Sequence, residues 1–180
     1  MKNIKLLLTA VSVMTVFTFT QCKKGKPDEP QLPPETNIGA MTFGCKVNGK
    51  IFVPKDGRGR PGLYVQYVNL GPGVGGGWYL NISAINWLPS TPEGVNINTD
   101  SLILREAVTY SFKYRKKGFV GAFYENGPQY DATENNLGEL RIKKFDNVSR
   151  IISGTFFFTG TDNSNGQTVS VTEGRFDIRY

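Results

Sequence analysis

The sequence predicts an all-β domain, an antiparallel β-sandwich of about nine or ten strands, with a β-barrel as the alternative. Three observations support this fold class. From Met41 onward, apolar and polar residues alternate with a period of two. Turn residues separate the alternating segments, and the chain has 21 glycines and 10 prolines to supply them. No segment has a convincing helical period, so we expect strands throughout.

The first predicted element is a β-hairpin over residues 42–54, TFGCKVNGKIFVP. Asn48-Gly49 supplies the positive φ angles that a type I′ turn requires. Pairing around this turn places Cys45 opposite Phe52 on the inward face. We therefore expect Cys45 to be a small buried hydrophobic residue and not an activated thiol.

The segments after this hairpin predict the remaining strands. Two tryptophans in them are expected to point to different faces of the sheet. Trp78 and Trp87 stand nine positions apart, so in one regular strand they alternate to opposite faces. Either a bulge intervenes or one ring faces outward, and both are candidate aromatic residues for ligand contact. Only alternate residues of a strand face one core, so Phe157 is expected to pack under a loop or a second layer. The predicted strands are residues 63–70, 78–87, about 98–106, 108–115 (with Val108, Tyr110, Phe112 and Tyr114 on one face), 119–125, 138–146, 150–161 and 168–180.

Residues 1–21 predict a secretory signal peptide. A short basic segment, MKNIK, precedes an uncharged apolar run of 14 residues from Leu6 to Phe19. This run is short for a stable membrane span, which needs about 20 apolar residues. No Ala-x-Ala cleavage site follows the run.

Cys22 stands three positions after the end of this apolar run. The stretch Phe19-Thr20-Gln21-Cys22 resembles the lipobox of bacterial lipoproteins, although Gln21 and Phe19 replace its usual small and aliphatic residues. The resemblance implies that the Cys22 thiol receives a diacylglycerol and that the leader is cut just before it. The alternative is a disulfide between Cys22 and Cys45, which an exported compartment permits.

Residues 22–40 then predict a lipidated cysteine with a flexible Pro/Lys-rich tether, and residues 41–180 the β domain. The protein is expected in the cell envelope, anchored by lipid to the outer membrane. The sequence does not decide between the periplasmic and the surface side of that membrane. Its net charge of +6 comes largely from five lysines within residues 1–26, which contain no acid. The remaining 16 basic and 15 acidic residues give +1, so nucleic-acid binding is not expected.

The chain contains no histidine, which removes the usual general base and the commonest zinc ligand. Gly71–Gly76 matches GxGxxG, but a strand-forming segment follows it instead of the helix that a dinucleotide site needs. Asn165-Gly166 predicts a hairpin turn in residues 161–168, with a calcium loop around Asp162 as the weaker alternative. Nothing in the sequence fixes a catalytic pair among its loop acids, so we expect neither an enzyme nor a cofactor; these acids are Glu125, Asp131, Glu134 and Glu139.

Both ends of residues 42–180 carry motifs of a known family. The opening Phe-x-x-x-Val-Asn-Gly-Lys begins at Phe43, and Ile152-Ser-Gly-Thr-Phe with Val171-Thr-Glu-Gly-x-Phe176 closes the chain. This pattern resembles a family of uncharacterised Bacteroidota cell-envelope lipoproteins. The resemblance implies an all-β fold and an envelope location, and it brings no established activity. Gly174 is expected to form a turn or bulge before Phe176.

These observations predict a non-catalytic binding or structural module of the envelope, with a membrane lipid anchor as its one defined partner. The alternative is a glycan-binding accessory lipoprotein that uses exposed aromatic residues, Trp78, Trp87 or the tyrosines of residues 64–79. An envelope protein is the other class of partner expected.

Overall fold

The computed structural model describes residues 30–180 apart from residues 74, 112–118, 126 and 134–136. Within these ranges the regular structure is eleven β-strands in one antiparallel sheet, which confirms the all-β prediction. No helix that could cross a membrane occurs in this part of the chain. The strands are β1 (Thr42–Val47), β2 (Lys50–Phe52), β3 (Leu63–Asn69), β4 (Trp78–Asn86), β5 (Glu93–Thr99), β6 (Thr109–Ser111), β7 (Phe119–Glu125), β8 (Gln129–Ala132), β9 (Gly138–Asp146), β10 (Ile151–Asp162) and β11 (Thr168–Arg179).

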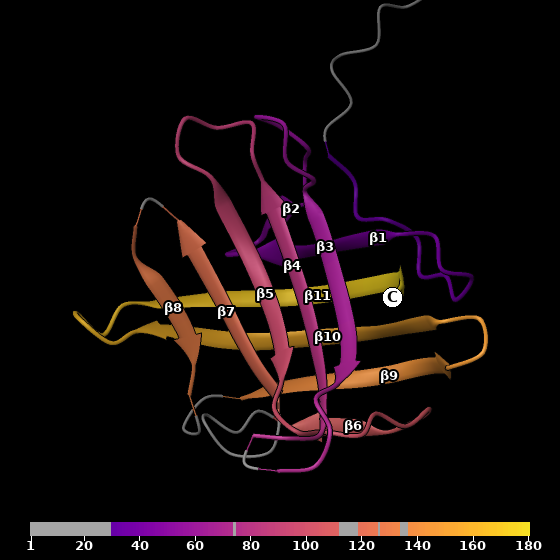
Figure 1. Ribbon diagram of the computed structural model, residues 1–180. Helices are drawn as coiled ribbons and strands as arrows, with labels where there is room; N and C mark the ends of the chain where they lie inside the picture. The colour runs from indigo at the N-terminus through magenta and orange to yellow at the C-terminus, as the bar shows by residue number, and fades with distance from the viewer. Residues whose placement is uncertain (1–29, 74, 112–118, 126, 134–136) are drawn as a thin grey trace, which may run out of the picture.

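The long strand β10 folds the sheet into two layers. Residues 151–158 of β10 pair with β9, and residues 160–162 pair on the same side with β8. One layer therefore has the order β6-β9-β10-β11-β1-β2, and the other continues from β8 through β7, β5 and β4 to β3. In Figure 1 the strands β3, β4, β5 and β7 cross in front of β1, β11, β10 and β9. The sheet is a curled half-barrel, continuous at β10 as in a barrel and layered as in a sandwich.

The core lies between these two layers and follows the period of two. Ile82, Val95 and Ile97 point inward from one layer, and Leu140, Ile152 and Phe158 point inward from the other. Phe156 stacks on Phe43 with ring centroids 5.2 Å apart. Burial of these side chains supplies the main free energy that holds the layers together.

The predicted first hairpin is confirmed. Asn48 and Gly49 have φ angles of 47° and 80°, as a type I′ turn requires. Cys45 pairs with Phe52 across β1 and β2, and both side chains are buried. The turn is therefore sufficient to set the register of this hairpin.

Two strand predictions need correction. The strand predicted near residues 98–106 is β5, which ends at Thr99, because Ser101 has a φ of 50° and turns the chain out of the sheet. Leu104 is nevertheless buried, where its backbone N–H donates to the Tyr67 hydroxyl at 3.3 Å. The prediction also missed β8, a strand of four residues. Of the face predicted within residues 108–115, Phe112 and Tyr114 lie outside the described residues.

Residues 32–40 lie against the outer face of the β1–β11–β10 layer. Asp177, which is 1% exposed, accepts hydrogen bonds from Thr36 Oγ1 at 2.6 Å, Ile38 N at 3.0 Å and Gly39 N at 2.8 Å. Pro33 packs so closely on Gly44 that a Cβ there would come within 2.6 Å of it. This part of the predicted tether is therefore docked on the domain, because its backbone finds a carboxylate acceptor that composition alone does not reveal.

Candidate functional site

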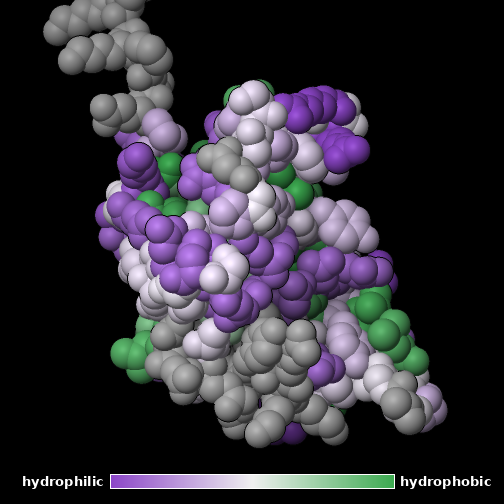
Figure 2. Space-filling view, turned by 90° about the vertical axis from the view of Figure 1, so that its left-hand side faces the viewer, coloured by the Kyte–Doolittle hydropathy of each residue, from purple (hydrophilic) through white to green (hydrophobic). Residues whose placement is uncertain are grey.

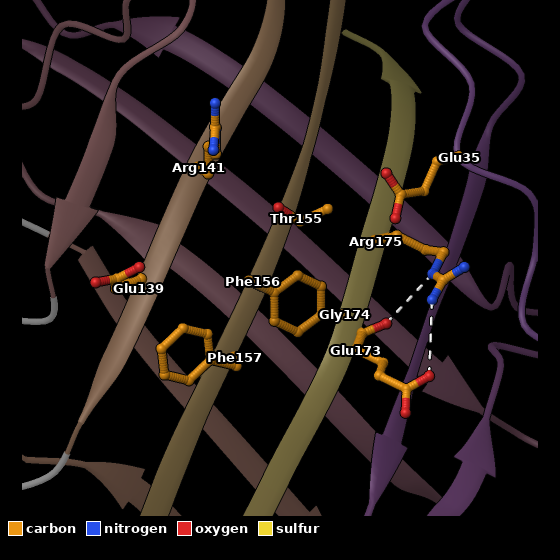
Figure 3. A pocket seen from close by; sticks show the side chains of 9 residues that line it. All are labelled: Glu35, Glu139, Arg141, Thr155, Phe156, Phe157, Glu173, Gly174 and Arg175. Atoms are coloured by element: carbon orange, nitrogen blue, oxygen red, sulfur yellow. Dashed lines mark hydrogen bonds and ion pairs between the residues drawn. The ribbon is translucent and has the colours of Figure 1, made fainter.

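A shallow pocket of about 390 Å³ opens on the outer face of β9, β10 and β11 (Figure 3). Strand register brings its residues together, since Glu139 lies opposite Phe157 and Arg141 lies opposite Thr155. Figure 3 shows the two phenyl rings of β10 between charged side chains of β9 on one side and those of β11 and the docked segment on the other. The lining residues are Glu35, Glu139, Arg141, Thr155, Phe156, Phe157, Glu173, Gly174 and Arg175.

A β-bulge in β11 shapes the pocket. Gly174 pairs with Phe156 and Val171 with Phe158, so two residues of β11, Thr172 and Glu173, face the single residue Phe157. Glu173 has a φ of 51°, which turns the local chain. The Phe156 ring lies where a Cβ of residue 174 would stand, 2.5 Å away. Glycine is therefore required at position 174, and the bulge predicted there is confirmed.

Phe157 remains 40% exposed at the floor of the pocket, so no loop or second layer of the described chain covers it. Charged groups surround the ring. Arg175 Nε donates to the Glu173 carbonyl at 3.3 Å, and its Nη2 lies 3.9 Å from Glu173 Oε2. Lys46 Nζ pairs with the other carboxylate oxygen of Glu173 at 2.5 Å. The pocket thus combines one apolar ring with several hydrogen-bonding groups, as binding sites for small polar ligands do.

One carboxylate of this pocket, Glu35, differs from the acid of a glycosidase. Such an acid needs a raised pKa. Glu35 instead pairs with Lys143, and the hydrogen bond from this ammonium lowers the pKa of the Glu35 carboxyl.

The two tryptophans lie at opposite ends of β4 and do not form a common platform. Trp78 points toward the core, where it stacks on Tyr67 with centroids 4.8 Å apart. Trp87 follows the end of β4, donates its indole N–H to the Pro61 carbonyl at 2.9 Å, and has the Arg60 guanidinium 4.9 Å over its ring. Both tryptophans are half-buried, and each ring contacts side chains of the domain.

Of the two cysteines, only Cys45 lies within the described residues. It is fully buried, and desolvation, followed by the nearby charge of Glu93, raises the pKa of its thiol to about 12. A thiol of this kind is not reactive near neutral pH. Its burial confirms the predicted role as a small core residue, which favours that role over pairing with Cys22, whose position lies outside the described residues.

The other sequence candidates occupy separate places. The loop of residues 71–76 joins β3 to β4, so a strand follows it, as predicted. Asp162 accepts hydrogen bonds from the Ser164 N–H and hydroxyl at 2.8 and 2.7 Å, which closes the turn between β10 and β11. Among the acids, Glu139 lines the pocket described above, Glu125 lines another, and Asp131 binds Gln129. Glu134 lies outside the described residues.

The sequence did not reveal Glu35, Arg141 or Arg175 as neighbours of Phe157. Their assembly depends on the bulge and on the docked segment, and neither is visible as a spacing in the sequence. The one available signal was the run Phe156-Phe157-Phe158, in which the middle ring must face away from the core.

Comparison with known proteins finds a match to a family model described as a domain of unknown function (DUF6252), over residues 80–177. The matched range begins in β4 and ends in β11, so it includes the bulge and most of the pocket. No curated protein and no solved structure matches the chain.

Proposed function

The chain belongs to the DUF6252 family, whose description gives no activity, and we propose from its own residues that it is an exported, lipid-anchored envelope protein. Its β domain acts as a non-catalytic binding or structural module. The motifs at Phe43 and Val171 support a place among Bacteroidota envelope lipoproteins, anchored in the outer membrane.

The observation that carries this proposal is the position of Cys22. It lies three positions after the end of a 14-residue apolar run and before three lysines within four positions. A thiol at this junction suits the thioether bond of a lipoprotein. Two or more acyl chains at one residue give stable anchoring, because burial contributes about 0.8 kcal/mol per methylene.

The docked segment limits how far the domain extends from such an anchor. Residues 32–40 lie on the sheet, so the nine residues 23–31 are left to span the gap. A fully extended chain of this length reaches about 30 Å. The anchor would therefore hold the domain close to the lipid surface.

Three features of the described residues support a non-catalytic role. Lys143 lowers the pKa of Glu35, and desolvation raises that of the Cys45 thiol, so neither group is suited to proton transfer or nucleophilic attack near neutral pH. The candidate acids Glu125 and Glu139 line different pockets. The chain as a whole also lacks histidine.

Replacing Cys22 with serine tests the proposal. We expect the wild-type protein in the membrane fraction, with an intact mass that shows leader removal and added acyl chains. Cys22→Ser should lose the acyl mass and the membrane association. Cys45→Ala is the matched control, because it removes the other thiol and should leave both readouts unchanged. Equal mass and equal fractionation of wild type and Cys22→Ser would refute lipid anchoring.

Glycan binding is the second candidate, and the composition of one sheet layer favours it. Strands β3, β4 and β5 comprise 23 residues and contain Glu93 as their single charged residue. The chain as a whole is 20% charged, so four or five charged residues would be expected there. The outward positions carry amides, hydroxyls and tyrosines, which suit an uncharged polyhydroxylated ligand.

A further inference from the structure

The outer face of β3, β4 and β5 presents two neighbouring rows of uncharged polar side chains, which we call the amide face. In one row Gln66 pairs with Asn81, and Asn81 pairs with Asn98. In the other row Tyr64 pairs with Ser83, and Ser83 pairs with Asn96. Figure 1 looks onto this layer from its outer side.

These side chains point away from the core. In β4 and β5 the alternate residues Leu80, Ile82 and Val95 are buried, so the residues between them face outward. Neighbouring strands lie about 4.8 Å apart, and residues i and i+2 of one strand lie about 7 Å apart. The two rows, which run across three strands, therefore cover an area of about 10 Å by 7 Å. That area matches a disaccharide in size.

The hydrogen-bonding capacity of the amide face is largely unused. No hydrogen bond joins the side chains of Gln66, Asn81 or Asn98 to any described residue. The side-chain carbonyl of Asn96 is buried and has no partner there either.

Aromatic rings flank the two rows. Tyr64 on the edge strand β3 is 51% exposed. Tyr124 of β7 lies over Gly94, where its ring fills the space of a missing Cβ. Sugars present hydroxyls at their edges and apolar C–H groups on their faces, and amides with tyrosine rings suit both.

We infer that the amide face binds an uncharged oligosaccharide, with Gln66, Asn81 and Asn98 as hydrogen-bonding residues. This inference rests on the proposed binding role and names its ligand class and surface. An anionic glycan would require lysine or arginine, and these three strands contain neither. Basic residues lie instead on the opposite layer, where Arg141 and Arg175 line the pocket of Figure 3.

Figure 2 shows the side at the left of Figure 1, which is largely hydrophilic with only scattered apolar patches. A sugar-binding face needs rings beside its polar groups, and the amide face combines the two in one register.

Native gel electrophoresis of the lipidated protein in detergent tests the inference, because a polysaccharide that binds the protein retards its migration. The gels contain laminarin, galactomannan or dextran, which are neutral, or polygalacturonate, which is anionic. We expect at least one neutral polysaccharide to retard the protein and polygalacturonate to leave it unretarded. Asn81→Ala and Asn98→Ala should each weaken binding about tenfold, the effect of one lost hydrogen bond. Asn163→Ala, which removes an exposed amide from the turn between β10 and β11, is the matched control and should bind as wild type.

Thermal melting of each variant shows that it is folded, and Gln66→Ala on the exposed edge strand replaces any variant that is not. Absence of retardation by all three neutral polysaccharides overturns the inference, as does retardation that Asn81→Ala and Asn98→Ala leave unchanged. Self-association through this face, seen as a concentration-dependent mass, overturns it as well. Acyl mass on Cys22 is a separate readout, so lipidation without glycan binding removes this inference and leaves the anchoring proposal in place.

Discussion

Asp177 holds the docked segment on the domain, and its replacement by asparagine should release that segment. The carboxylate is buried and accepts hydrogen bonds from Thr36 Oγ1, Ile38 N and Gly39 N. Asparagine keeps the shape but has one acceptor oxygen in place of two, and its amino group would face a donor. The substitution removes the charge, and it places the new NH2 group either against the Gly39 N–H or against the Thr36 hydroxyl and the Ile38 N–H.

The expected loss of unfolding free energy is about 3 kcal/mol. Hydrogen bonds to a charged group contribute about 1.5–3 kcal/mol each, so the full set gives an upper limit well above this value. The segment is at the surface and can undock, after which Ile38 N and Gly39 N bind water. Undocking removes their desolvation cost, so we expect the loss to equal about one or two such bonds.

The same carboxylate gives a pH dependence whose sign follows from its pKa. Burial raises the pKa of Asp177, but the hydrogen bonds from Thr36, Ile38, Gly39 and Ala40 outweigh this and bring it below the usual value. A carboxyl whose pKa is lowered on folding stabilises the protein above its unfolded pKa, near 3.9. This stability is lost as the pH falls through the lower folded pKa. The difference between wild type and Asp177→Asn should therefore be full at pH 7 and shrink with acid.

Urea denaturation and hydrogen exchange measure the two effects. Asp177→Asn should lower the unfolding midpoint and speed exchange at the amides of residues 38 and 39. Asp131→Asn is the matched control, because its carboxylate lies on β8 and accepts a hydrogen bond from the Gln129 side chain at 2.7 Å. An unchanged midpoint with slow exchange at Ile38 and Gly39 would show that the segment is held by its apolar contacts and not by Asp177.

Two further predictions concern the core. Gly174→Ala should destabilise the protein by about 1–3 kcal/mol, because its Cβ would meet the Phe156 ring; a melting temperature equal to wild type would contradict the bulge geometry. Cys45 should resist labelling by a thiol reagent at pH 8 until the protein unfolds, since burial raises its pKa to about 12. Rapid labelling of the native Cys22→Ser variant, which has only this thiol, would show that the β1–β2 hairpin opens.

Local signals account for the parts of the fold that the sequence predicted. Asn48-Gly49 sets a two-residue turn, and that turn alone determines the pairing of Cys45 with Phe52. The end of β5 was misplaced because Leu102 and Leu104 are apolar, and burial in an irregular segment leaves the same pattern as burial in a strand. The strand β8 is too short to show a period, although it joins the two layers.

The pocket and the docked segment depend on contacts between distant residues. Asp177 and Thr36 are 141 positions apart, and no spacing rule connects them. A proline-rich stretch is typical of a tether, yet residues 36, 38 and 39 donate hydrogen bonds to a carboxylate that faces out of β11. The amide face, by contrast, was readable in part, since outward amides alternate with buried apolar residues in Asn81, Asn96 and Asn98.

The positions of the docked segment and the amide face together determine which side of an anchored domain is free. Thr36 binds Asp177, and Glu35 binds Lys143. Asp177 and Lys143 both face outward from the layer that contains β9, β10 and β11. The amide face is the outer side of the other layer, which crosses it in Figure 1. A lipid at Cys22, connected by at most about 30 Å of chain, would therefore pull on the layer opposite the amide face. Anchoring and binding would then use different layers of the curled sheet, so an envelope protein of this kind could hold a glycan while its anchor stays in the membrane.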